Sequence, residues 1–260
     1  MRRLYRPLRR LAFPPLRRLG LGAVELLLPS RCAVCGSGLA GDLGSALCPD
    51  CHLAMPWLPA DTCALCQSAP PGADLPWCAS CAARDSPLSA CVAAVSLRGA
   101  CELWIRRFKY PVAGLANLDP TPAVVMREIV REAAARAPGK APEWVVPIPL
   151  HARRLRARGF NPAALLARDV AAEVGARFLT RALRRTRDTP SQTARGRRER
   201  LRNVAGAFEL RRGIPVAGRV WLVDDVVTTG ATLEAAARAL RRAGCREVVA
   251  VCAARTLAEH

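Results

Sequence analysis

The chain has 260 residues, of which 51% are apolar, and it carries 40 Lys and Arg against 21 Asp and Glu. This length suits one substantial domain plus a smaller one with an ordinary buried core, and the composition excludes a disordered or fibrous protein. The formal net charge of +19 makes contact with a polyanion a hypothesis to test, because neutralised phosphates release counterions.

Residues 1–27 form an arginine-rich leader that begins like a signal peptide. Its apolar run is short, contains Glu25 and ends in Pro29 and Ser30 without a small-residue cleavage site, which argues against secretion. No segment reaches the ~20 apolar residues that a membrane-spanning helix needs. We therefore expect a cytoplasmic protein with a solvated, disordered leader. The alternative is a leader that rests on a membrane surface as a basic amphipathic segment.

Four Cys-x-x-Cys pairs lie within residues 28–90, separated by 12, 11 and 11 residues. Eight thiolates at this spacing are typical of two tetrahedral zinc ions, and the metal is structural because sulfur fills every position. Sequential pairing, first pair with second and third with fourth, is preferred, and an interleaved arrangement stays open. The expected ligands are Cys32, Cys35, Cys48, Cys51, Cys63, Cys66, Cys78 and Cys81. The other four cysteines, Cys91, Cys101, Cys245 and Cys252, are expected to be ordinary buried residues.

The rest of the chain alternates apolar strands with helices. The predicted elements are a strand over 143–150, an arginine-rich loop through Phe160, a helix from Pro162 to Gly175, an irregular arginine-rich arm over 181–205, a strand over 219–225, a helix over 232–243 and a strand from 246. Asn161 is a good N-cap, and Pro162 fits a first helical turn. This alternation predicts a mostly parallel sheet whose site lies beyond the carboxyl ends of its strands.

The segment WLVDDVVTTGAT, residues 221–232, combines a buried strand, an acidic pair and a turn into a helix. Asp224 and Asp225 are costly to bury without partners, and a vicinal diol with a divalent ion would satisfy both. The following Thr and Gly residues offer hydroxyls and free backbone amides to a dianionic phosphate. The alternative is a polar turn that merely caps the helix.

This segment resembles the phosphoribosyl pyrophosphate motif of type I phosphoribosyltransferases. Residues 26–254 resemble the ComF family of competence-related proteins in the blocks LLLPSRCAVCG, RRFKY, VPIPLHARRLRARGFN and TPSQTARGRRERLRNVAGAF. Pro162 departs from the family, which often has Gln there, and so does PVAGLANLDP after Tyr110. The resemblance implies an α/β fold, a phosphoribosyltransferase-like mostly parallel sheet with helices on both faces, over 91–260, preceded by a double zinc ribbon over 28–90.

The resemblance also implies a set of site residues. Those expected at phosphoribosyl pyrophosphate are Asp224, Asp225, Val226, Val227, Thr228, Thr229, Gly230, Ala231 and Thr232. Those of the pyrophosphate loop are Leu150, His151, Ala152, Arg153 and Arg154, with Lys109, Arg158 and Asn161 as further candidates. His151 is a candidate base, although a solvent-exposed loop histidine is the plainer interpretation. The expected cofactors are two structural Zn²⁺ and Mg²⁺ bound with phosphoribosyl pyrophosphate.

By the same resemblance, the chain is an accessory protein of DNA uptake or utilisation with a domain that binds phosphoribosyl pyrophosphate or a related ribose 5-phosphate. Single-stranded DNA and DNA-uptake proteins are further expected partners. The alternatives are an active phosphoribosyltransferase of nucleobase or nucleotide metabolism and a noncatalytic sensor of phosphoribosyl pyrophosphate. Only 5% of residues are aromatic, which argues against direct binding of single strands by base stacking. The acceptor, catalysis and the oligomeric state stay open.

Overall fold

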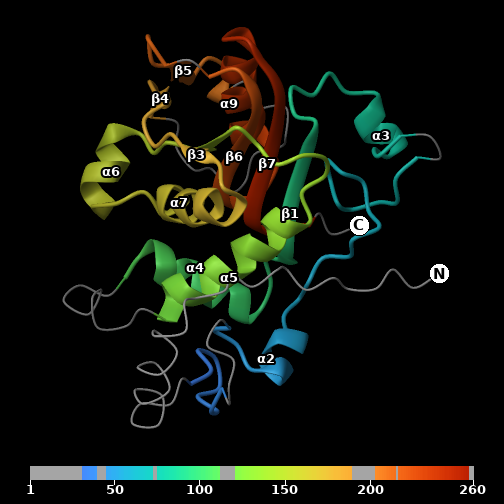
Figure 1. Ribbon diagram of the computed structural model, residues 1–260, viewed down its shortest axis with the longest axis vertical. Coiled ribbons are helices and arrows are strands. Elements are labelled where there is room, and N and C mark those ends of the chain that lie inside the picture. The colour runs from blue at the N-terminus through green and yellow to red at the C-terminus, as the bar shows by residue number, and fades with distance from the viewer. Residues whose placement is uncertain are drawn as a thin grey trace. The chain divides into compact units, whose positions relative to one another are not determined.

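The structure is a computed structural model (Figure 1) that describes residues 31–39, 45–72, 75–111, 121–188, 203–214 and 216–257. Its contacts divide the chain into two compact units, residues 1–53 and 54–260. The leader over 1–27 lies outside the described residues, as does most of the arginine-rich arm. No helix among the residues described is long and apolar enough to cross a membrane.

The first unit is organised around cysteine turns. Its described helix is α2 (Pro49–Leu53), and an isolated bridge joins Arg31 to Gly38. Two of its cysteines, Cys32 and Cys48, are as buried as its apolar side chains. A module this small lacks the apolar surface for an ordinary core, so it depends on a cross-link such as a bound metal.

The second unit is built on a five-stranded sheet. The strand order is β1 (Ala90–Ser96), β7 (Cys245–Arg255), β6 (Gly218–Val227), β2 (Trp144–Pro147) and β3 (Arg177–Phe178). All four neighbouring pairs are parallel, which confirms the predicted sheet. A separate antiparallel pair joins β4 (Leu183–Arg185) to β5 (Phe208–Leu210).

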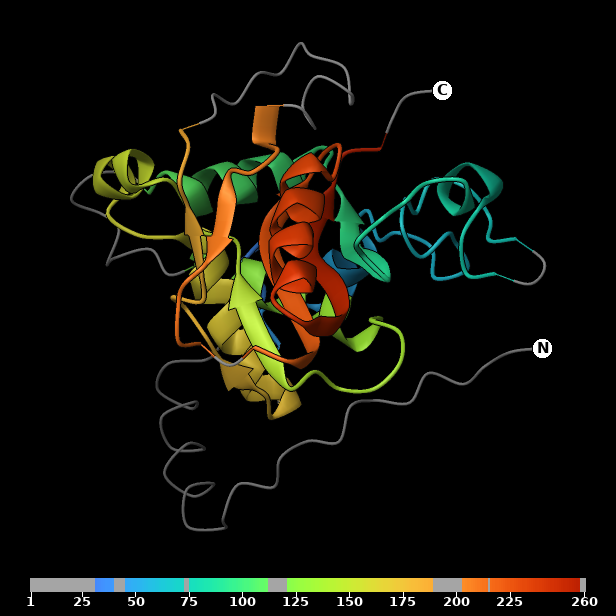
Figure 2. The same cartoon turned by 90° about the horizontal axis from the view of Figure 1, so that it is seen from above.

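Helices cover both faces of the sheet, as expected. Helices α5 (Thr121–Ala135) and α7 (Pro162–Val174) pack on one face, with α4 (Ala100–Lys109) against α5, while α9 (Ala231–Arg242) packs on the other (Figures 1 and 2). Helix α7 begins at Pro162, and Gly175 caps its end with a left-handed φ of 68°. The predicted start and end of this helix are therefore confirmed.

Two local predictions were wrong. Residues Ala152–Arg158 form a helix, α6, where an arginine-rich loop was expected, and Gly159 ends it with a left-handed φ of 84°. Residues Leu183–Arg185 form β4 within the segment expected to be irregular. Both elements are shorter than the window over which hydrophobic periodicity becomes visible, so neither left a recognisable pattern.

The segment that carries the second cysteine group covers the outer edge of β1. The amide of Leu58 donates to the Ala94 carbonyl at 2.8 Å, and the amide of Ser96 donates to the Pro56 carbonyl at 2.8 Å. This pairing satisfies backbone groups that an open sheet edge would leave exposed. The second cysteine group therefore lies in the same compact unit as the sheet, whereas the sequence suggested a boundary near residue 90.

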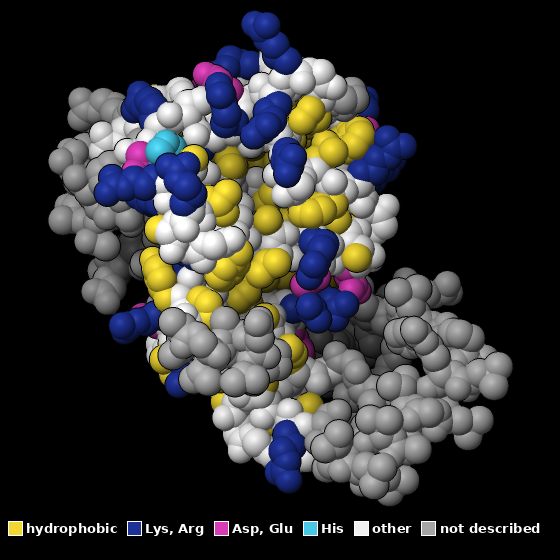
Figure 3. Space-filling model, turned by 90° about the vertical axis from the view of Figure 1, so that its left-hand side faces the viewer, with side chains coloured by type: hydrophobic (Ala, Val, Ile, Leu, Met, Phe, Trp, Pro, Cys, Tyr) yellow, Lys and Arg dark blue, Asp and Glu magenta, His cyan; other side chains and the backbone are white. Residues whose placement is uncertain are grey.

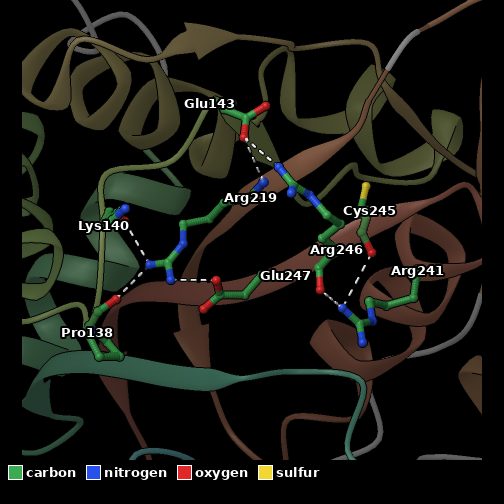
Figure 4. Close-up of polar contacts among 8 residues, drawn as sticks. All are labelled: Pro138, Lys140, Glu143, Arg219, Arg241, Cys245, Arg246 and Glu247. Atoms are coloured by element: carbon green, nitrogen blue, oxygen red, sulfur yellow. Dashed lines mark hydrogen bonds and ion pairs between the residues drawn. The ribbon is translucent and has the colours of Figure 1, made fainter.

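An ion-pair network ties together the amino ends of the strands (Figure 4). The Arg219 guanidinium at the start of β6 donates to the carbonyls of Pro138 and Lys140 at 2.9 and 2.7 Å and pairs with Glu247 at 2.5 Å. Glu143 accepts a hydrogen bond from the Arg219 amide at 3.4 Å. These contacts lie at the amino ends of the strands, whereas a ligand site is expected at the opposite edge, beyond the carboxyl ends.

Candidate functional site

The acidic pair lies at the carboxyl end of β6, as predicted, with its two side chains on opposite faces of the sheet. Successive strand residues alternate in direction. Leu222 belongs to the buried cluster that also contains Leu233 and Leu240 of α9, so Asp224 points to the α9 face. Asp225 points to the other face, toward α4.

Asp225 is paired with a lysine from that helix. The Lys109 ammonium lies 2.8 Å from Asp225 Oδ1, and the Asp225 side chain is only 10% exposed. Asp224 Oδ1 accepts a hydrogen bond from the Asp225 amide at 2.9 Å. The structure thus brings three of the predicted site residues together, two from the motif and one from more than one hundred positions earlier in the chain.

The ionisation of Asp224 is strongly perturbed. Burial, together with the neighbouring charge of Asp225, raises the pKa of Asp224 to about 7, although Lys109 and Arg185 oppose the shift. A carboxyl that titrates near neutrality can take up or release a proton when a ligand binds.

Arg185 is a site residue that sequence reasoning missed. It projects from β4, and its guanidinium carbon lies 5.5 Å from the centroid of the Phe208 ring. Burial and the charge of Arg154 lower the pKa of Arg185, whereas Asp224 and Asp188 raise it. In the sequence, Arg185 is one of many arginines of the arm. Its position in β4 singles it out, and that strand was not predicted.

The phosphate loop follows the acidic pair and leads into α9. Gly230 is the N-cap of this helix, with a left-handed φ of 78° that favours glycine. Thr228 is exposed, whereas Val227 and Ala231, on either side of the loop, are buried in the protein core. Free amides at the start of a twelve-residue helix suit an anion. The Thr residues of the motif therefore line the loop, and its apolar members hold it in place.

The predicted pyrophosphate loop follows β2, the strand that pairs with β6. The Ile148 amide donates to the Val223 carbonyl at 2.9 Å, so this loop starts beside the acidic pair. The Asn161 side-chain amide donates to the Ile148 carbonyl at 2.9 Å and fixes the turn. Leu150 follows the strand and is half-buried, and Ala152 opens α6.

Asp188 lies close to three polar residues of this loop. Its carboxylate oxygens lie 3.4 Å from Arg154 Nε, 3.8 Å from His151 Nδ1 and 3.9 Å from Arg153. His151 also caps α6, because its Nδ1 accepts a hydrogen bond from the Arg153 amide at 3.4 Å. Sequence reasoning did not single out Asp188. On the face drawn in Figure 3, basic side chains gather beside a histidine and an acidic side chain.

Arg158 supports the site instead of reaching the acids. Its guanidinium donates to the Tyr110 hydroxyl at 2.9 Å and stacks 4.7 Å from the Tyr110 ring centroid. The Phe108 and Phe160 rings meet edge to face with centroids 6.4 Å apart. These contacts hold the end of α6 against the end of α4, next to Lys109.

The eight predicted metal ligands form two groups of four. In each group the sulfur atoms lie within 4.8 Å of one another, and the groups join the first pair with the second and the third with the fourth, as sequential pairing expects. Sulfurs at roughly 2.3 Å from a tetrahedral zinc lie about 3.8 Å apart. The Cys35–Cys48 and Cys66–Cys78 sulfur distances are 3.6 and 3.8 Å, so both groups fit zinc. The remaining cysteines are buried, as predicted.

Known proteins resemble this chain in sequence. Residues 155–259 match a family model described as phosphoribosyl transferase domain. The chain is 34% identical over 232 residues to the DNA utilization protein YhgH of Salmonella typhimurium, a match that covers 87% of this chain and 90% of that protein. It is 33% identical over 147 residues to Competence protein F of Haemophilus influenzae, covering 55% of this chain and 63% of that protein.

A weaker likeness is found among solved structures. The glutamine phosphoribosylpyrophosphate amidotransferase of B. subtilis, solved in complex with ADP and GMP, matches with a TM-score of 0.38 and 19% identity. The match covers 64% of this chain and 32% of that one.

Proposed function

Because the chain belongs to the ComF family of competence-related proteins, we propose that it is a cytoplasmic accessory protein of DNA uptake or utilisation whose phosphoribosyltransferase domain binds phosphoribosyl pyrophosphate. The observation that carries the proposal is the meeting of an acidic pair and a glycine-containing helix start at the end of β6. Strand β2 delivers a basic loop beside them.

Each part of the ligand has a matching group in this proposal. The carboxylates of Asp224 and Asp225 accept hydrogen bonds from the ribose hydroxyls, and their oxygens are the ligands that Mg²⁺ prefers. Magnesium neutralises charge on the pyrophosphate when it is bound. The hydroxyls of Thr228, Thr229 and Thr232 and the amides of the loop hold the 5-phosphate. Arg153 and Arg154, which follow β2, face the pyrophosphate.

Lys109 changes its partner in this scheme. In the ligand-free protein its ammonium offsets the charge of Asp225. When the ribose and the metal ion take over that task, Lys109 is released to contact the pyrophosphate. A flexible lysine suits such an exchange, because its point charge does not require a fixed planar geometry.

An active phosphoribosyltransferase is the second candidate. This function is favoured by the cations near the acidic pair, because Lys109 and Arg185 are both close enough to lower the pKa of Asp224. Positive groups at this position would stabilise the negative charge that develops on a departing pyrophosphate.

Titration calorimetry tests the first part of the proposal. Phosphoribosyl pyrophosphate is titrated into the zinc-loaded chain with and without Mg²⁺, and saturable binding that strengthens with Mg²⁺ is expected. Absence of binding under both conditions would contradict the proposal. A screen for pyrophosphate release in the presence of single nucleobases then separates a transferase from a sensor, which releases none above the background rate.

A further inference from the structure

The Asp188 carboxylate lies between two arginines of the basic loop after β2. Arg154 Nε lies 3.4 Å from Asp188 Oδ1, and Arg153 Nη1 lies 3.9 Å from Asp188 Oδ2. Each carboxylate oxygen therefore faces a different arginine. Guanidinium groups bind the oxygens of a phosphate in the same way as those of a carboxylate, so Asp188 offers these arginines what a phosphate would offer them.

These side chains border an open hollow on the surface. Its volume is about 390 Å³, and it is lined by Arg153, Arg154, Ala157 and Asp188. This volume lies within the range of small-ligand sites. Asp188 is the acidic member of the lining, and it stands where the two arginines would otherwise meet an anion from solution.

The hollow and the acidic pair belong to one charged region. Burial and the charge of Arg154 lower the pKa of Arg185, whereas Asp224 and Asp188 both raise it. Arg185 is thus within electrostatic reach of an arginine of the hollow, of Asp188 and of an acid at the end of β6. A ligand held at the end of β6 can therefore extend a negatively charged group toward Arg153 and Arg154.

The contacts of Asp188 with this loop are weak. Charged N–H···O hydrogen bonds are typically ~2.7–2.9 Å long, and both arginine contacts are longer. His151 Nδ1 lies 3.8 Å from Asp188 Oδ2, but this nitrogen accepts a hydrogen bond from the Arg153 amide and has no proton to donate. The Asp188 side chain is 29% exposed, and exposed ion pairs contribute little to stability. An anion with more charge and more oxygens, such as pyrophosphate, can therefore displace it.

We propose that Asp188 is an internal competitor of the ligand: its carboxylate takes the place of the pyrophosphate beside Arg153 and Arg154 and leaves when the ligand binds. The inference rests on the proposed function and deepens it, because it names a residue that regulates the affinity of the same site. Binding has to break the contacts of Asp188 with both arginines. The affinity for a ligand with a pyrophosphate group is therefore lower than the basic loop alone would give.

Calorimetry on the full-length, zinc-loaded chain with Mg²⁺ tests the inference with phosphoribosyl pyrophosphate and ribose 5-phosphate. Asp188→Asn should bind phosphoribosyl pyrophosphate about threefold or more tightly than the wild type, because both arginines lose a competing carboxylate. Its affinity for ribose 5-phosphate, which has no pyrophosphate, should stay within twofold of the wild type.

Glu209→Gln is the matched control. It also removes a single negative charge, from the strand that pairs with β4, where the Glu209 carboxylate lies 2.9 Å from Arg184. This variant should change neither affinity. An equal gain in Glu209→Gln, or an equal gain for ribose 5-phosphate in Asp188→Asn, would reveal a general effect of net charge and overturn the inference.

The direction of the change in Asp188→Asn decides the role of the acid. Weaker binding of phosphoribosyl pyrophosphate would show that Asp188 positions the arginines or contacts the ligand, and unchanged binding would show that it does not compete. Both results overturn the inference and leave the proposed function standing. If neither ligand binds the wild type or the variants, the proposed function and the inference are both contradicted. Asp188→Ser should bind as Asp188→Asn does, and it replaces that variant if thermal melting shows that Asp188→Asn is unfolded.

Discussion

At the scale of single residues, the strand geometry of β6 explains why two adjacent aspartates behave differently. Asp225 points toward α4 and has the Lys109 ammonium at 2.8 Å. Asp224 points toward the α9 face, where burial and the Asp225 charge raise its pKa to about 7. Asp225 is thus paired with a lysine, whereas Asp224 is about half protonated near pH 7 and loses its proton as the pH rises or when a cation binds beside it.

The double variant Asp224→Asn with Asp225→Asn tests the ligand role of the pair. Binding of phosphoribosyl pyrophosphate with Mg²⁺ should fall at least a hundredfold, because amides are poor ligands for this ion and accept fewer hydrogen bonds. The fold should survive, since two repelling acids are removed. Calorimetry and thermal melting are the measurements. An unchanged dissociation constant in a folded double variant would refute the assignment.

The pH dependence of stability tests the raised pKa of Asp224. An aspartate with a pKa of about 7 in the folded protein and 3.8 as its ordinary value binds a proton more readily when folded. Its contribution to stability is therefore full below pH 4 and lost as the pH rises through 7. Asn mimics the protonated form, so Asp224→Asn should be more stable than the wild type by roughly 1–3 kcal/mol at pH 8.

The difference between the two proteins should vanish near pH 4, provided both remain folded there. Denaturant unfolding of the ligand-free chain at several pH values gives the measurement. A wild-type protein whose stability relative to Asp224→Asn is independent of pH would show that Asp224 titrates normally.

Removal of the Lys109 charge gives a further test at this scale. Lys109→Met should destabilise the ligand-free protein by about 1–3 kcal/mol, because the largely buried Asp225 carboxylate loses a charged hydrogen-bond partner. Lys109→Arg should recover part of this loss. Arg106→Met serves as the control, because it removes a positive charge from an exposed position of the same helix. Equal melting temperatures for Lys109→Met and the wild type would contradict the pairing.

At the scale of elements, sequence reasoning succeeded where long periodic segments met specific end signals. Asn161, Pro162 and Gly175 marked α7, and the acidic pair marked the end of β6. It failed for α6 and β4, which are short, and it proposed no element over β1, α4 or α5. Strand β1, ACVAAVS, is buried along its whole length, so it has no alternation of apolar and polar residues to recognise.

The candidate site was predictable in its motif and not in its long-range partners. Arg185 lies in β4 and Asp188 follows it, and β4 pairs with β5, a contact between segments separated by a stretch outside the described residues. Local pattern contains no information about such a pairing. Lys109 was expected from the family resemblance, and its contact with Asp225 follows from the packing of α4 near β6.

The two cysteine groups should differ in what they stabilise. We expect two zinc ions per chain by elemental analysis. Cys32→Ser should remove one and leave the melting of the second unit unchanged, because that group lies in residues 1–53. Cys63→Ser should remove the other and also lower the melting temperature of the second unit, because Gln67 is bonded to β1 and Arg255.

Thermal melting of both serine variants, with zinc content measured alongside, makes the comparison. Identical melting curves for Cys63→Ser and Cys32→Ser would show that the second group is energetically independent of the sheet. That result would favour the boundary near residue 90 that the sequence suggested.

At the scale of the whole molecule, charge is the dominant feature. Binding two Zn²⁺ to eight thiolates adds four positive and eight negative charges, so the formal net charge of +19 becomes +15. Much of the excess comes from the arginine-rich arm over 181–205, of which only the ends are described. An arm of this charge is consistent with a solvated segment, with a surface for nucleic acid and with a cover over the bound sugar phosphate.

Substitution of four arm arginines distinguishes these roles. Arg195, Arg197, Arg198 and Arg200, which lie outside the described residues, are changed together to Ser. If the arm contacts single-stranded DNA, wild-type affinity should fall steeply with salt, with a log–log slope of about 0.7 per phosphate contacted, and the variant should have a smaller slope. Sequence preference should be slight, because arginines that contact phosphates position a strand without reading its bases.

If the arm covers the sugar phosphate, the variant should instead bind phosphoribosyl pyrophosphate more weakly and keep its DNA affinity. A variant with wild-type DNA affinity and wild-type salt slope would exclude the nucleic-acid role for the arm.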